Sequence, residues 1–138
     1  MNITIETTVN APIDRVWPAW DDPRAIEQWN AAPTDWHTPR ARVDLREGGQ
    51  FSSRMEAKDG SMGFDFAGTY TRIEPQRLIE YAMGDTRTVR VEFIPAGDAV
   101  TVRETFDTED THTAKQQRQG WQAILDNFAR HVKSGQRS

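Results

Sequence analysis

The sequence predicts a single α+β domain in which a curved antiparallel sheet packs on a long C-terminal helix, with two short helices after the first strand. Alternating apolar and polar residues recur from Ala41 to Phe106 in segments joined by short turns, which indicates successive hairpins. Apolar residues at steps of three and four from Thr111 to Lys133 indicate one long amphipathic helix. An antiparallel sheet with one apolar face must cover that face, and this helix is long enough to do so. A strongly twisted sheet around one helix leaves space at one end, so a pocket is expected there.

Length and composition narrow the classes of protein to consider. We expect residues 1–133 to form one domain and residues 134–138 a flexible tail. A mean hydropathy of −0.76 argues against membrane insertion, and the N-terminus lacks the pattern of a secretory signal, so a cytoplasmic protein is expected. The lack of cysteine excludes disulfides, thiol nucleophiles and cysteine-based zinc sites. The net charge of −4 argues against a nucleic-acid partner.

The first strand and the first short helix are predicted from residues 3–20. Apolar and polar residues alternate from Ile3 to Val9, which is typical of a half-buried strand. Pro12 suits the first position of a helix, because its missing N–H needs no partner there. Pro18 lies further into the helical pattern and should kink or end the helix near Trp17.

A second short helix and an irregular loop follow. Asp22 before Pro23 is the pattern of an N-cap with a first-turn proline, and the helix that it begins carries Trp29 on its apolar face. The next stretch, Asn30–Pro39, has no regular periodicity and is predicted to be a loop that carries Trp36 and His37. Loops with such residues often border a site.

The middle of the chain predicts strands joined by tight turns. The expected strands are Ala41–Leu45, Phe51–Met55, Met62–Ile73, Leu78–Met83, Val89–Phe93 and Val100–Phe106. Gly48-Gly49 and Lys58-Asp59-Gly60-Ser61 are turn signals, and Asp44 is expected to cap the first of these turns or to pair with an arginine. The strand Val89–Phe93, or the first strand, could lie at an edge and pair across a homodimer, so both monomer and homodimer stay open.

Glu104 is the exception in the last strand. It falls on the apolar side of the alternation that Val100, Val102 and Phe106 define. A carboxylate on the inner face of a sheet needs a partner or a shifted pKa. Either a bulge or a plain ion pair takes Glu104 to the outside, or it points into the cavity and marks a site.

The C-terminal helix has a start signal and one unfavourable residue. Thr113 and Gln116 have the spacing of a capping box. Gly120 costs about 1 kcal/mol within a helix relative to alanine, so some gain should offset it. Close approach of the helix to a strand at this position, or room for a ligand there, would offset this cost.

Several spaced motifs carry a resemblance that spans nearly the whole chain. They are Trp29, then Asp44-Leu45-Arg46-Glu47-Gly48-Gly49, then Gly68-Thr69-Tyr70 leading to Ile73-Glu74-Pro75, and Gly120-Trp121 with Leu125. Together they resemble the AHSA1-type (activator of Hsp90 ATPase homologue 1-like) branch of the START-like (SRPBCC, Bet v 1-like) superfamily. The resemblance implies a helix-grip fold with a cavity between sheet and helix. It implies little about chemistry, because that superfamily includes lipid carriers, polyketide cyclases and antibiotic-sequestering proteins.

Aromatic residues exceed what one small core requires, and aromatic walls with a few polar groups suit a hydrophobic or aromatic ligand. The residues expected to bind it are Trp29, Trp36, His37, Phe51, Phe64, Phe66, Tyr70, Tyr81, Phe93, Glu104, Trp121 and Leu125. Plain core packing is the alternative for half or more of them. The three histidines are too scattered for a metal site, and the sequence holds no phosphate-loop, dinucleotide or nucleophile-elbow motif, so neither a metal nor a cofactor is expected.

Three hypotheses of function follow. The first is a non-catalytic protein that holds a small apolar or aromatic molecule between the sheet and the C-terminal helix. The second is a cyclase- or hydrolase-like enzyme that uses Glu104, Asp65 or His37 as acid or base in the same cavity. The third, by analogy with the Hsp90 activator, is a chaperone-linked interaction module.

Overall fold

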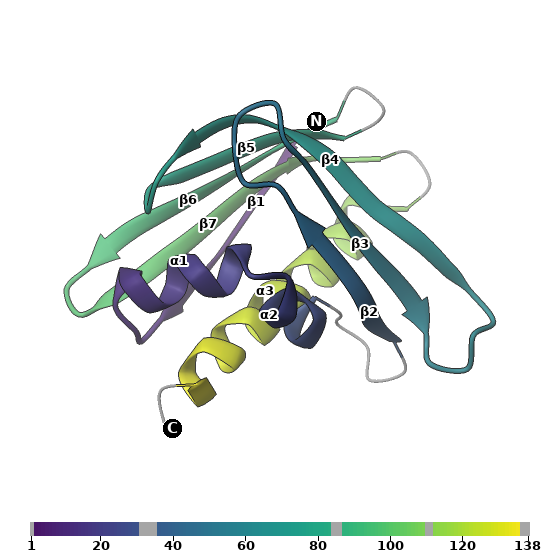
Figure 1. Cartoon of the computed structure of the whole chain (residues 1–138), viewed down its shortest axis with the longest axis horizontal. Coiled ribbons are helices and arrows are strands. Elements are labelled where there is room, and N and C mark those ends of the chain that lie inside the picture. The colour runs from purple at the N-terminus through teal and green to yellow at the C-terminus, as the bar shows by residue number, and fades with distance from the viewer. Residues whose placement is uncertain (1, 31–35, 84–86, 110–111, 136–138) are drawn as a thin grey trace.

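The computed structural model describes residues 2–30, 36–83, 87–109 and 112–135, which form a curved sheet, two short helices and one long helix. The elements in chain order are β1 (Asn2–Val9), α1 (Ile13–Asp21), α2 (Pro23–Trp29), β2 (Trp36–Val43), β3 (Gln50–Ala57), β4 (Gly63–Glu74), β5 (Leu78–Met83), β6 (Thr88–Ala96), β7 (Ala99–Asp107) and α3 (Ala114–Gly135). Figure 1 shows the sheet arching over α3, with α1 and α2 on the same side of the sheet. The predicted fold class is confirmed.

Every strand pairing in the sheet is antiparallel, in the order β1-β7-β6-β5-β4-β3-β2. The edge position expected for Val89–Phe93 is wrong, because β6 lies between β5 and β7. β1 is an edge, and side chains of α3 bind its backbone: Arg118 donates to the carbonyl of Thr4 at 3.1 Å and Gln122 to that of Glu6 at 3.2 Å. These bonds hold α3 along β1, at one edge of the sheet.

The long helix begins where its capping residues predict. The backbone N–H of Gln116 donates to the Thr113 hydroxyl at 3.1 Å, and that of Thr113 donates to the Gln116 side-chain oxygen at 3.0 Å. The apolar stripe then buries Leu125, Phe128 and Val132 against the sheet and the short helices. The helix runs to Gly135 and so overlaps the expected tail by two residues, and residues 136–138 lie outside the described part. No described helix is both long and apolar enough to cross a bilayer.

The short helices differ from expectation at one proline. Helix α1 continues past Pro18 to Asp21, and its last turn is closed by the Asp22 N–H, which donates to the Pro18 carbonyl at 2.8 Å. Packing of Trp17 and Trp20 in the core gives this last turn a stabilising contact that local propensity does not include. Asp22 is the N-cap of α2 as predicted, since its carboxylate accepts from the N–H of Arg24 at 3.0 Å.

The predicted loop Asn30–Pro39 is too long, because β2 begins at Trp36. Trp36 is paired with Ala57, and the register of β2 against β3 shifts between His37 and Arg40, around Pro39. A proline lacks the N–H of a regular ladder, but β2 is an edge strand, where that loss is tolerated. Residues 31–35 of the predicted loop lie outside the described part.

The turn between β2 and β3 explains the adjacent glycines of the sequence motif. Gly48 has a φ of +85°, and a Cβ on Gly49 would lie 2.1 Å from the carbonyl oxygen of Asp44. The Gly48 N–H donates to the Tyr70 carbonyl at 2.8 Å, which fastens this turn to β4. Asp44 pairs with Arg46 at 2.9 Å, one of the two roles expected for it.

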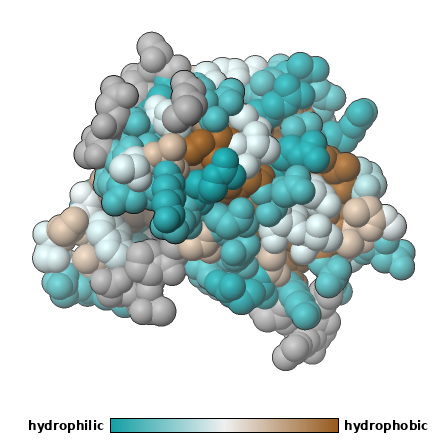
Figure 2. All heavy atoms as spheres, turned by 180° about the vertical axis from the view of Figure 1, so that it is seen from behind, coloured by the Kyte–Doolittle hydropathy of each residue, from teal (hydrophilic) through white to brown (hydrophobic). Residues whose placement is uncertain are grey.

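The charged residues lie mainly on the outside. Seen from behind, hydrophilic side chains cover most of the surface, and hydrophobic ones show in small patches between them (Figure 2). The apolar face of the sheet is therefore turned inward, toward α3.

Candidate functional site

A cavity of about 180 Å³ lies between the sheet and α3, and we call it the aromatic cavity. Its walls come from α1, α2, β3, β4, β5, β7 and α3, with contributions from β2 and from the end of α2. The lining residues are Trp20, Ile26, Trp29, Asn30, Val43, Phe51, Ser53, Met55, Phe64, Phe66, Tyr70, Tyr81, Glu104, Trp121, Ile124 and Leu125. An engineered cavity of about 150 Å³ in another protein admits benzene, so this one has room for a molecule with a single ring.

Strand periodicity builds the wall opposite the helix. Phe51 on β3 and Phe66 on β4 have ring centroids 5.8 Å apart, and Tyr81 on β5 lies edge-on to Phe51 at 4.7 Å. Gly68 makes this arrangement possible, because a Cβ there would lie 2.9 Å from the Phe51 ring and 2.7 Å from the carbonyl oxygen of Ala82. The glycine thus lets an aromatic ring lie directly on the strand.

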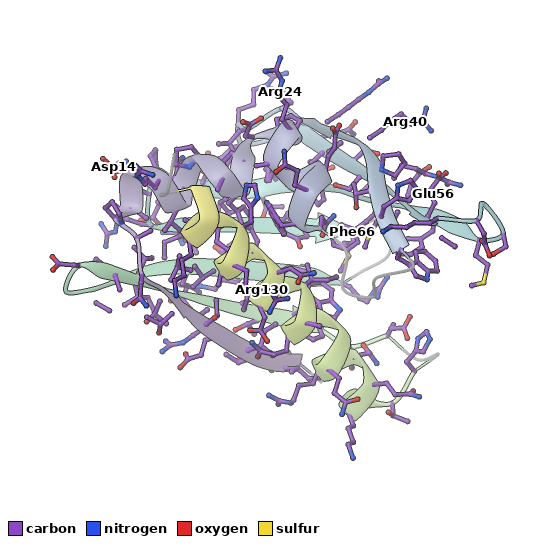
Figure 3. The ribbon with its side chains drawn as sticks, turned by 90° about the horizontal axis from the view of Figure 1, so that it is seen from below. Asp14, Arg24, Arg40, Glu56, Phe66 and Arg130 are labelled. Carbon is purple, nitrogen blue, oxygen red and sulfur yellow. The ribbon has the colours of Figure 1, made fainter. Side chains whose placement is uncertain are left out.

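The helix closes the cavity with Trp121. Its ring stacks on Phe106 at 4.0 Å and meets Phe66 edge-on at 5.9 Å. Viewed from below, Phe66 lies in the interior beside α3, whereas Glu56 lies at the rim of the molecule (Figure 3). Phe64, Phe66 and Trp121 also line a second, more open hollow near the start of α3, so the two spaces share one wall.

Glu104 is the polar group on the floor of the aromatic cavity. β7 pairs Glu104 with Ile5 on β1 and with Val91 on β6 in unbroken register, so no bulge turns its side chain outward. Glu104 is only 6% exposed, and its carboxyl makes no hydrogen bond or ion pair with any residue that the structure describes. Burial raises the pKa of this carboxyl to about 8, so it is mostly protonated at neutral pH. The inward alternative for Glu104 is therefore the one found.

Two tyrosines share this environment. Burial, followed by the neighbouring Glu104 and Tyr70, raises the pKa of the Tyr81 hydroxyl well above its usual value. Burial and the nearby Asp21 and Asp44 raise that of Tyr70 in the same direction. Both phenols stay neutral across the physiological range, so neither supplies a charge to the cavity.

Asp21, at the end of α1, is a second carboxyl with a displaced pKa. Burial raises its pKa to about 7, and one of its oxygens is buried with no hydrogen-bond partner among the described residues. Asp21 does not line the aromatic cavity, but its charge contributes to the raised pKa of Tyr70, which does line it.

Most residues expected to bind a ligand lie on the cavity wall. Those that line it are Trp29, Phe51, Phe64, Phe66, Tyr70, Tyr81, Glu104, Trp121 and Leu125. Phe93 instead packs in the core against Trp17 and Trp20, with ring centroids 5.2 and 5.9 Å apart. Trp36 does not line the cavity; its ring centroid lies 6.1 Å from that of Phe64, which does.

The two other acid–base candidates do not line the aromatic cavity. His37 lies 3.7 Å from Glu56, with its side chain 42% exposed. Asp65 is 65% exposed and lies 3.5 Å from Arg54. Both positions alternate with inward-facing neighbours on their strands, and the pleat turns them to the other face. Glu104 is the member of the proposed acid–base set that reaches the cavity.

Some lining residues were not expected, although periodicity contained a signal for them. Ser53 and Met55 follow Phe51 at steps of two on β3, and Ile26 precedes Trp29 by one helical turn. Asn30 has no such pattern; it is the C-cap residue of α2, and its carbonyl accepts from the Thr38 hydroxyl at 2.7 Å.

Gly120 is not a point of close contact between α3 and a strand. A Cβ on it would meet nothing within 4 Å, and it borders the open hollow near the start of α3. Of the two gains considered for this glycine, close approach to a strand is excluded. In the described part of the chain, no three acidic or histidine side chains converge as metal ligands would.

Comparison with known proteins gives consistent matches. The model of the family described as "Activator of Hsp90 ATPase homolog 1-like protein" matches residues 10–133. The solution structure of an AHSA1-like protein from Aeromonas hydrophila is 50% identical in sequence, with a TM-score of 0.92 over 98% of this chain and 94% of that one. A protein from Cytophaga hutchinsonii is 44% identical, with a TM-score of 0.84 over 99% of this chain and 94% of that one. A protein from Nitrosomonas europaea shares the fold at 18% identity, with a TM-score of 0.82 over 100% of this chain and 97% of that one. A search of curated proteins finds no match.

Proposed function

The chain belongs to the activator of Hsp90 ATPase homolog 1-like family, and on that premise we propose that it binds a small apolar or aromatic molecule in the aromatic cavity. The observation that carries the proposal is a cavity of about 180 Å³ walled by aromatic side chains and lined by the carboxyl of Glu104, which has no ion-pair partner among the described residues. Burial of apolar surface is favourable, so walls of this composition favour an apolar occupant over water. The fold is one that commonly holds hydrophobic ligands, which supports the same reading.

The bound molecule is expected to be held without a cofactor, in the cytoplasm, by a monomer or a homodimer. Aromatic walls contribute large apolar contact areas, and a few polar groups orient the ligand. Here Ser53, Asn30, Tyr70, Tyr81 and Glu104 are among the lining side chains able to form such bonds.

Native mass spectrometry of freshly purified protein, compared with its denatured mass, tests the proposal. Ser53→Leu places an isobutyl group in the cavity, while Ser52→Leu adds the same group at the adjacent position, which does not line it. We expect an additional mass with the wild type and with Ser52→Leu, and its loss with Ser53→Leu. A ligand retained equally by both variants would place the binding elsewhere.

An enzymatic role has one specific observation in its favour. A protonated carboxyl in an apolar pocket can act as a general acid, as buried carboxyls do in known hydrolases. The discriminating test is recovery of the bound molecule after incubation with wild type and with Glu104→Gln. Chemical change by the wild type alone would favour catalysis, and an unchanged molecule would favour binding.

The chaperone-linked hypothesis stays a prediction that rests on the name of the family. It is tested by the ATPase rate of an Hsp90-type protein with and without an excess of this chain. An unchanged rate would count against it.

A further inference from the structure

The aromatic cavity offers acidic and aromatic groups and no basic one. Glu104 is the carboxyl among the lining residues, and none of those residues is lysine, arginine or histidine. The faces of aromatic rings carry a partial negative charge, so the walls and the carboxyl have the same electrostatic preference. A second unpaired carboxyl oxygen, on Asp21, lies near enough to Tyr70 to influence its ionisation. The cavity is thus complementary to positive charge.

The carboxyl of Glu104 is positioned for a partner that the protein does not supply. It is more than nine-tenths buried, lines the cavity, and has no hydrogen-bond or ion-pair partner among the described residues. Its neighbours across the sheet are Ile5 and Val91, and the helix above contributes Trp121, Ile124 and Leu125 to the lining. Tyr81 is the titratable side chain that senses its charge, and Tyr81 stays neutral. When ionised, this carboxyl has no counter-charge among the described lining residues, so an incoming cation is the partner that would favour its ionised form.

We propose that the ligand is an apolar amine, whose positively charged nitrogen pairs with Glu104 and whose hydrocarbon body packs between the aromatic walls. This inference rests on the proposed binding function and names the ligand class of the same cavity. A charge-assisted hydrogen bond is roughly twice as strong as one between neutral groups. Cation–π contact with desolvated rings adds to it. An anionic ligand would meet a carboxyl with no basic side chain beside it, and is disfavoured.

Binding of an amine has a proton balance that can be measured. In the empty cavity Glu104 is mostly protonated at neutral pH, since burial raises its pKa to about 8. When an ammonium group enters, the carboxyl loses its proton to the solvent and the ion pair remains. Binding at pH 7 should therefore release about 0.9 proton per molecule bound. A neutral ligand that accepts a hydrogen bond from Glu104 would release none.

The test compares three probes of similar shape on the full chain: 2-phenylethylammonium, propylbenzene and 3-phenylpropanoate. Affinity and proton release are measured at pH 7 by titration calorimetry in two buffers of different ionisation enthalpy. We expect wild type to bind the ammonium probe at least ten-fold more tightly than propylbenzene, with proton release, and to bind the carboxylate most weakly. Glu104→Gln should bind the ammonium probe no better than propylbenzene. Asp65→Asn, which removes an exposed acid that does not line the aromatic cavity, should behave as wild type.

The outcomes separate this inference from the proposed function. Propylbenzene binding as tightly as the ammonium probe would overturn the amine assignment and leave a cavity that takes neutral apolar molecules. Ammonium binding without proton release, or binding unaffected by Glu104→Gln, would also overturn it. Failure of all three probes to bind wild type would contradict both. The probe series and the proton count need only wild-type protein, so the test holds even if a variant fails to fold.

Discussion

Replacing Glu104 with glutamine should flatten the pH dependence of stability. Burial raises the pKa of this carboxyl from 4.5 to about 8 in the folded state. Between these values the folded protein keeps a proton that the unfolded chain releases, so the free energy of unfolding falls as pH rises. Below pH 4.5 both states hold the proton, and above about pH 8 neither does, so the loss is confined to this window.

The size of the effect follows from the shift. Each pH unit within the window changes the free energy of unfolding by about 1.4 kcal/mol per proton. From pH 5 to pH 7 the wild type should lose about 2–3 kcal/mol of unfolding free energy through Glu104, and Glu104→Gln should not. The glutamine variant should therefore gain on the wild type as pH rises, whatever their difference at pH 5.

Urea unfolding of both proteins at pH 5, 6, 7 and 8 measures this difference. Other titrating groups contribute equally to both proteins, so subtraction isolates position 104. A stability difference that stays constant across the series would mean that Glu104 is paired or solvated, and would refute the argument for an unpaired buried carboxyl.

Four further outcomes follow from other positions. In the wild type, Asp21 should also make the free energy of unfolding fall as pH rises, up to about pH 7, and Asp21→Asn should remove this fall. Urea unfolding of the variant and the wild type over the same pH series measures it. Gly68→Ala should lower the free energy of unfolding by about 1–3 kcal/mol, because its Cβ meets the Phe51 ring; unchanged urea midpoints would contradict that contact. Gly120→Ala should instead stabilise by about 1 kcal/mol, since its Cβ meets nothing, and a lower melting temperature would show hidden crowding. Thr113→Ala should cost about 1 kcal/mol through loss of the helix cap, which thermal unfolding checks against Thr113→Ser as a conservative control.

Much of the fold could be predicted from local sequence patterns, because each of these patterns depends only on residues close together in the chain. The capping box at Thr113 and the N-cap at Asp22 were predicted correctly, since a cap is set within a few residues. The strands predicted around Phe51, Phe66 and Tyr81 are confirmed as β3, β4 and β5, and these three side chains line the cavity. Pro18 does not end the helix at Trp17, which was one of the two outcomes expected for it, because packing of the surrounding tryptophans is not a local property.

The sequence by itself determined most of the elements, the alternation within several strands and the position of Glu104 on the apolar side of the last strand. Only the tertiary structure decided which inward residues face the cavity and which fill the core. Phe93 is inward by alternation, but α1 lies over it and its ring packs against Trp17. Glu104 is inward because β1 and β6 pair with β7 without a bulge, and it has no ion-pair partner among the described residues because α3 contributes Trp121, Ile124 and Leu125 to the lining with it. Periodicity specifies a direction for each side chain, whereas the space in front of it depends on where distant elements pack.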